Sequence, residues 1–91
     1  MRRYIIEREI PGVGGLDHEQ RRDVAAQSNK ALATLAGKAQ WERSYEVDDK
    51  TFCIYLADDE TAVSSHAQLS GFPASKITEV RSVIEPMTAV L

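Results

Sequence analysis

The chain has 91 residues, of which 43% are hydrophobic and 27% are charged, and its 11 basic and 14 acidic residues give a net charge of −3. These proportions are typical of soluble globular domains and exclude a disordered chain, and the length predicts a single domain over residues 1–91. The acidic balance disfavours a broad surface for nucleic acid. Because a domain this small buries only about 60–65% of its unfolded surface, we expect it to gain stability by association.

Cysteine usage and hydropathy indicate the compartment. The one cysteine, Cys53, has no partner within the chain for a disulfide, which favours a reducing cytoplasm. No apolar run approaches the roughly 20 residues that a membrane span requires, and the short apolar stretch 4–6 is followed at once by charged residues, unlike a signal peptide. We therefore expect a cytoplasmic protein with no membrane partner.

The first half of the chain predicts a strand and a helix. Residues 3–10 are rich in β-branched and aromatic types, and the glycine-rich run 11–15 ends that strand in a flexible turn. Asp17 stands at an N-cap position with Gln20 three residues later. Apolar and small residues then recur at helical spacing as far as Gly37, which predicts a helix of about 19 residues.

The second half predicts a hairpin, a second helix and a last strand. Residues 41–47 and 50–57 have strand character and flank Asp48-Asp49, which is typical of a tight turn. Asp58 or Asp59 is expected to cap a helix that ends at Gly71. Residues 76–85 are again β-rich, and Pro86 is expected to stop that strand and leave residues 87–91 loose or docked.

The predicted order is βαββαβ. This order defines an α+β fold of the ferredoxin-like type, in which two helices lie on one face of a four-stranded antiparallel sheet. Because the helices cover one face only, the other face must meet water, a ligand or a second subunit.

The hairpin register decides which side chains share a face. A two-residue loop places Tyr45 opposite Phe52, Arg43 opposite Ile54 and Trp41 opposite Leu56, on a largely apolar face. A three-residue loop would place Tyr45 opposite Cys53 instead. We prefer the first register because it separates apolar from polar side chains, and we expect the open face to be the polar one, with Glu42, Ser44, Glu46, Thr51, Cys53 and Tyr55, joined by Glu7 and Glu79.

Two interpretations of that polar face remain open. Carboxylates beside a thiol would repel one another unless a cation, Arg81 or a partner subunit neutralised them, which is typical of a divalent-metal or polar-ligand site. Acidic strand residues are also common on solvated or dimer-buried faces, where they pair with arginines, and this second interpretation is the more frequent case.

The two histidines differ in their surroundings. His66 shares the apolar stripe of the second helix, so it should point inward as a hydrogen-bonded structural residue, a proton carrier or a metal ligand. His18 has Arg21 and Arg22 one turn away, which would repel a bound cation. We therefore discount His18 as a ligand within one subunit.

Several linked segments together carry a resemblance to a known family. The chain resembles a bacterial family of small ferredoxin-like domains of unknown function, some of which are described as nickel-binding. The resemblance extends from Arg3 to about Pro86. The segments that carry it are residues 3–8, Trp41 with Ser44-Tyr45, Asp48-Asp49-Lys50 with Cys53, Tyr55 and Ala57, and His66-Ala67 with Gly71-Phe72-Pro73-Ala74 and Ile77-Thr78-Glu79-Val80.

The resemblance implies a cytoplasmic homodimer that binds or sequesters a divalent transition metal, nickel above others, and it implies no established enzymatic activity. Cys53, His66 and Glu79 stand at positions of the shared segments, and Glu7 joins them from the acidic face, as candidate metal ligands. Imidazole suits nickel, thiolate is a soft ligand and carboxylate can complete an octahedral shell. With two histidines in the chain, a tight site would need carboxylates, water or residues of another subunit.

The alternative function is an enzyme or small-ligand module of the dimeric α/β-barrel type. In such a protein two open sheet faces would enclose an organic substrate. Tyr55 and Cys53 would line that space, and a desolvated Glu79 would act as general base.

Overall fold

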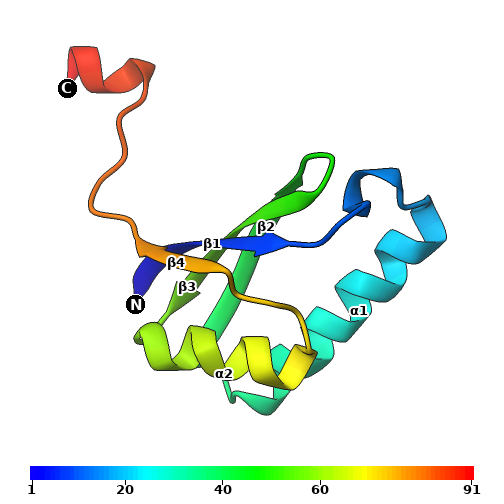
Figure 1. Cartoon of the computed structure of the whole chain (residues 1–91). Coiled ribbons are helices and arrows are strands. Elements are labelled where there is room, and N and C mark those ends of the chain that lie inside the picture. Colours follow the sequence, from blue (N-terminus) through cyan, green and yellow to red (C-terminus); the bar gives the residue numbers. More distant parts are fainter.

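The structure is a computed structural model that describes all 91 residues. Its elements follow the order β1 (Arg2–Glu9), α1 (His18–Thr34), β2 (Ala39–Glu46), β3 (Lys50–Ala57), α2 (Glu60–Ser70) and β4 (Lys76–Glu79), with short 3₁₀ turns at Val13–Gly15 and Pro86–Val90. Both helices lie on the same side of the sheet (Figure 1). The predicted βαββαβ order and the ferredoxin-like α+β fold are confirmed. No helix is long and apolar enough to cross a membrane.

Local signals fix the start of α1 and both ends of α2. The side chain of Asp17 accepts a hydrogen bond from the Gln20 backbone, and the Gln20 side chain accepts one from the Asp17 backbone, which completes the predicted capping box. Asp59, rather than Asp58, caps α2 through the backbone N–H of Ala62. Gly71 ends α2 in the left-handed conformation, with φ of 79°, that glycine adopts without strain.

The sheet has the strand order β2-β3-β1-β4, with every neighbouring pair antiparallel. We call the face under α1 and α2 the inner face and the opposite one the outer face. The inner face carries buried side chains from β1 and β3, namely Tyr4, Ile6, Arg8, Thr51, Cys53, Tyr55 and Ala57. The outer face carries the alternate residues, including Ile5, Glu7, Phe52, Ile54 and Leu56, which are half-buried.

The hairpin follows the two-residue-loop register near its turn. Tyr45 lies opposite Phe52 and Arg43 opposite Ile54, as predicted. A bulge between Trp41 and Arg43 then shifts the pairing, so that Trp41 lies opposite Tyr55 instead of Leu56. Because a bulge inserts one unpaired residue, it places Trp41 on the inner face, whereas Arg43 and Tyr45 lie on the outer face.

The assignment of the two sheet faces was wrong. Ser44, Glu46, Thr51, Cys53 and Tyr55 do share a face, but it is the inner face that the helices cover, not the open one. The helices present small residues such as Ser28, Ala31 and Ala62 to the sheet, which leaves room for large polar-tipped side chains. The open outer face instead carries an apolar strip of Ile5, Phe52, Ile54 and Leu56 among charged side chains.

The last strand is shorter than predicted. β4 ends at Glu79 instead of residue 85, and its only neighbour, β1, begins at Arg2. Val80 N–H donates to the Arg3 carbonyl 2.8 Å away, and beyond it only Arg2 of β1 remains as a possible partner. Residues 81–91 run away from the rest of the molecule (Figure 1), with Ile84 87% exposed and Leu91 95% exposed.

The glycine-rich turn after β1 is held in place, not loose. Gly12 N–H donates to Asp49 Oδ1 at 2.9 Å, and Gly14 N–H donates to the Asp48 carbonyl at 3.1 Å. Val13, between them, is only 4% exposed. The Asp48-Asp49 turn of the hairpin thus anchors the entry to α1.

Candidate functional site

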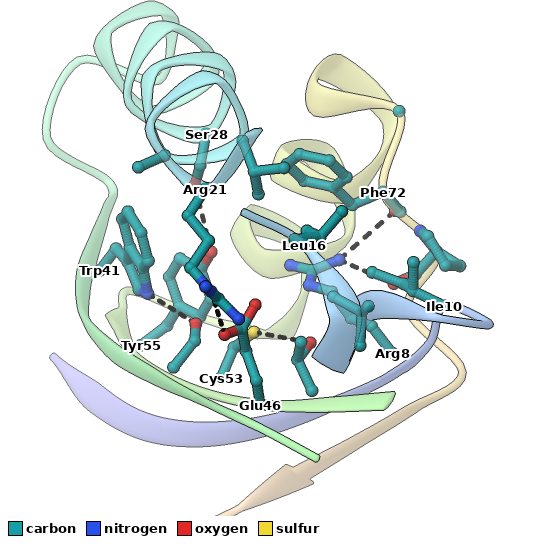
Figure 2. Close-up of a pocket in the computed structure, with 17 residues that line it drawn as sticks. Arg8, Ile10, Leu16, Arg21, Ser28, Trp41, Glu46, Cys53, Tyr55 and Phe72 are labelled. Carbon is teal, nitrogen blue, oxygen red and sulfur yellow. Dashed lines mark hydrogen bonds and ion pairs between the residues drawn. The ribbon is translucent and has the colours of Figure 1, made fainter. Parts of the chain in front are cut away.

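A pocket of about 560 Å³ lies between the inner face and α1 (Figure 2). This volume falls within the roughly 300–1,000 Å³ that small-molecule sites occupy. Most of its accessible wall is apolar, with a few polar groups. The lining residues come from β1, the glycine-rich turn, α1, both hairpin strands and the segment after α2, and they include Arg8, Ile10, Val13, Leu16, Val24, Trp41, Cys53, Tyr55 and Phe72.

Arg8 contributes a buried positive charge to this pocket. The residue is 2% exposed, and its Nη1 donates to the carbonyls of Phe72 at 3.3 Å and Pro73 at 2.8 Å. Its guanidinium carbon lies 5.9 Å from the centre of the Tyr55 ring and 6.0 Å from that of Phe72. None of the four ion pairs of the protein involves Arg8.

His66 extends the polar cluster behind Arg8. It is 1% exposed, as the helical pattern predicts, with Nδ1 3.4 Å from Arg8 Nη2 and Nε2 3.1 Å from Ser28 Oγ. Because a guanidinium only donates, Nδ1 must accept, and the proton resides on Nε2, which donates to Ser28. His66 in this tautomer cannot take a proton from Ser28, so the pair does not form a nucleophile and its base.

Burial shifts two pKa values in this cluster. Burial lowers the pKa of His66 below its usual 6.5, and the charge of Arg8 lowers it further, against a smaller opposing effect of Ser28. Burial raises the pKa of Tyr55 above 10.0, although its hydrogen bond with Ser28 and the Arg8 charge oppose the shift. At neutral pH both side chains are uncharged, and Arg8 carries the only charge of the cluster.

An ion pair lies beside the opening of the pocket. Arg21 Nε is 2.7 Å from Glu46 Oε1, and both side chains are partly exposed. Figure 2 shows Arg21 reaching from α1 towards Glu46, between Trp41 and Leu16. Glu46 is the one carboxylate among the lining residues, and Arg21 neutralises it.

The four predicted metal ligands do not come together in one subunit. Cys53 and His66 lie on the buried side of the sheet, whereas Glu7 lies on the outer face near Lys50 and Glu79 pairs with Arg2 at the β4 edge. No group of three or more His, Cys, Asp or Glu side chains is placed to hold a metal ion. Cys53 and His66, the two buried candidates, do not suit a cation as they stand. Both His66 nitrogens already have hydrogen-bond partners, and the positive charge of Arg8 is adjacent.

Sequence reasoning missed Arg8, the role of Ser28 and the bulge that separates Trp41 from Arg43. Arg8 alternates with Tyr4 and Ile6 along β1, so its inward direction follows from the two-residue period of a strand. A charged residue at an inward position was the available signal. Ser28 lies on the predicted helical stripe, but its pairing with His66 depends on how α1 and α2 pack.

Fold and pocket together define a small ferredoxin-like α+β domain with a cavity between its sheet and its helices. Residues 4–80 match the family model described as "Nickel responsive protein SCO4226-like". The chain belongs to this family. Among solved structures, the crystal structure of SCO4226 from Streptomyces coelicolor A3(2) is similar, with a TM-score of 0.73 and 15% identity over 90% of this chain and 99% of that chain. At that identity the likeness shows the fold. No curated protein matches.

Proposed function

We propose that this single-domain protein is a cytoplasmic homodimer that binds or sequesters Ni²⁺. The observation that carries the proposal is the match of residues 4–80 to a family of nickel responsive proteins. The proposal invokes no catalytic step. Nickel would be the ion that the protein holds, not a cofactor for a reaction.

The arrangement of donors favours a site that includes two subunits. The accessible carboxylates of the predicted set are Glu7 and Glu79, each in an exposed ion pair that contributes little to stability and can be exchanged for a metal ion. One subunit supplies too few donors at either position for an octahedral shell. A two-fold dimer presents each donor twice, and water would complete the shell. Cys53 and His66 would become ligands only if the inner face opened.

The outer face supports the homodimer. Ile5, Phe52, Ile54 and Leu56 form an apolar strip there that no helix covers. Extended apolar surface on a small domain is typical of an interface. The segment 81–91 adds exposed apolar side chains, with Val83, Ile84 and Leu91 out of contact with the core. Pairing two copies would remove these groups from water.

Calorimetric titration of metal-free protein with Ni²⁺, beside Mg²⁺ and Zn²⁺, tests the proposal. We expect heat and thermal stabilisation with Ni²⁺, and loss of at least about tenfold in affinity in Glu7→Gln or Glu79→Gln if those carboxylates are ligands. Glu9→Gln is the matched control, because Glu9 is an exposed carboxylate of the same strand as Glu7. His66→Ala and Cys53→Ser test the interior pair in the same way. Absence of both heat and stabilisation with Ni²⁺ would remove the proposal.

A further inference from the structure

The charge of Arg8 is not compensated by any acid of the protein. Its partners are two backbone carbonyls, the neutral imidazole of His66 and the aromatic rings of Tyr55 and Phe72. Removing a cation from water costs several kcal/mol unless an anion accompanies it. Glu46 lines the same pocket, but it is engaged with Arg21.

Arg8 also keeps a donor free. Its Nη1 and Nη2 have protein partners, but its Nε has none. Every fully buried side-chain nitrogen and oxygen of the protein has a hydrogen-bond partner. The Nε atom of Arg8 is therefore not fully buried, and the space next to it is the pocket that Arg8 lines. Nε and Nη2 lie on one edge of a guanidinium, the edge on which a carboxylate can bind with both oxygens.

The remaining walls of the pocket suit an apolar group. Val13, Leu16 and Val24 lie on the side of the turn and α1, and Trp41 and Phe72 add aromatic surface. Figure 2 shows Leu16, Trp41 and Phe72 around the same space that Arg8 enters from β1. An occupant with an apolar body and one negative charge would match both the walls and the cation.

We propose that this pocket binds a small organic monocarboxylate, with its carboxylate on Arg8 and its apolar body against the α1 side. One uncompensated cation matches a single negative charge, whereas a phosphate dianion would leave an excess charge in an apolar pocket. The site is separate from the nickel proposal, because it involves Arg8 and the pocket walls and needs no metal.

The first test compares acids with their neutral amides. Metal-free protein in EDTA, which excludes binding through a metal ion, is titrated with octanoate and 3-phenylpropanoate and with octanamide and 3-phenylpropanamide, followed by calorimetry and by the NMR signals of Trp41 and Cys53. We expect the carboxylates to bind and to move these signals, and the amides to bind at least about tenfold more weakly, because they lack the charge-assisted hydrogen bonds. Equal binding of acid and amide would overturn the proposal, as would no binding of any probe at millimolar concentration.

The second test uses variants. Arg8→Met should abolish the preference for acid over amide, and Arg22→Met, at an exposed arginine of α1, should preserve it. Because Arg8 also donates to the backbone carbonyls of the segment after α2, binding by Arg8→Met is compared only in protein shown to be folded. Ala25→Phe adds bulk to the α1 wall of the pocket and keeps Arg8, and it should weaken carboxylate binding at least about tenfold. Unchanged binding in Ala25→Phe would show that the acid does not occupy this pocket, and an unchanged preference for acid over amide in folded Arg8→Met would show that Arg8 is purely structural. Either result would overturn the proposal.

Discussion

Arg8 Nη2 lies 3.4 Å from His66 Nδ1, so a proton added to His66 would set two donors against each other. The neutral ring accepts from Arg8 and donates to Ser28 without conflict. The protonated ring would lose the Arg8 contact and place a second positive charge beside a guanidinium that has no acid partner. The folded state therefore holds His66 neutral.

We expect stability to fall as the pH drops below 6.5. The folded pKa of His66 is lowered, so between that value and the unfolded 6.5 the unfolded chain binds more protons than the folded one. The neutral His66 ring makes its full contribution to the free energy of unfolding above pH 6.5, and this contribution declines as the pH falls towards the folded pKa. Urea unfolding between about pH 5 and 8 measures it.

His66→Gln should flatten that pH dependence, because glutamine does not titrate. His18→Gln is the matched control, since His18 is exposed in the first turn of α1, and it should retain the dependence of the parent protein. A parent protein whose stability is constant across this window would contradict the buried neutral histidine.

The buried phenol of Tyr55 predicts a second loss of stability, at alkaline pH. Burial raises its pKa above 10.0, so above pH 10 the unfolded chain releases a proton that the folded state keeps, and stability should fall as the pH rises. A tyrosinate absorbance titration of Tyr55→Phe should lack one phenol that ionises above pH 10 in the parent protein. The same variant should have a free energy of unfolding about 1 kcal/mol lower at neutral pH. Tyr45→Phe, at a 54% exposed tyrosine, should change it by less than about 0.5 kcal/mol.

Local signals were sufficient to predict the elements and their order. The Asp17 and Gln20 capping box and the left-handed Gly71 depend on a few neighbouring residues, so the sequence alone specifies them. The length of β4 was not predictable in this way. Residues 80–85 have strand character, but β1 begins at Arg2 and has no residue left to pair with 82–85.

The choice of buried face depends on packing, which the alternation of a strand does not reveal. In β3 the set Thr51, Cys53, Tyr55 and the set Phe52, Ile54, Leu56 both alternate correctly, and apolar composition favours burying the second. The first set lies on the inner face, where Ser28 hydrogen-bonds the Tyr55 hydroxyl and the Thr51 hydroxyl hydrogen-bonds the Cys53 thiol, so its polar atoms are satisfied. The pocket was missed for the same reason, since its walls come from segments that meet only in the folded protein.

The apolar strip on the outer face leads to a prediction about association. Ile54→Lys places a charge between Ile5 and Arg43 at the middle of that face, so the variant should be folded but monomeric by light scattering. Ser64→Lys, on the exposed side of α2, adds the same charge elsewhere and should leave the proposed dimer intact. A dimeric Ile54→Lys would exclude the outer face as the interface.

The contact between the glycine-rich turn and the hairpin predicts a difference between two adjacent glycines. A Cβ at Gly14 would lie 2.7 Å from the Val47 carbonyl oxygen and 3.0 Å from Asp48 Cα, and both are backbone atoms that cannot rotate away. Gly14→Ala should therefore displace the turn from the hairpin and lower the free energy of unfolding by about 1–3 kcal/mol. A Cβ at Gly15 meets nothing within 4 Å, so Gly15→Ala should be neutral or stabilise by up to about 1 kcal/mol through the unfolded chain. Urea unfolding of the two variants measures the difference, and equal stabilities would mean that the turn does not pack against the hairpin.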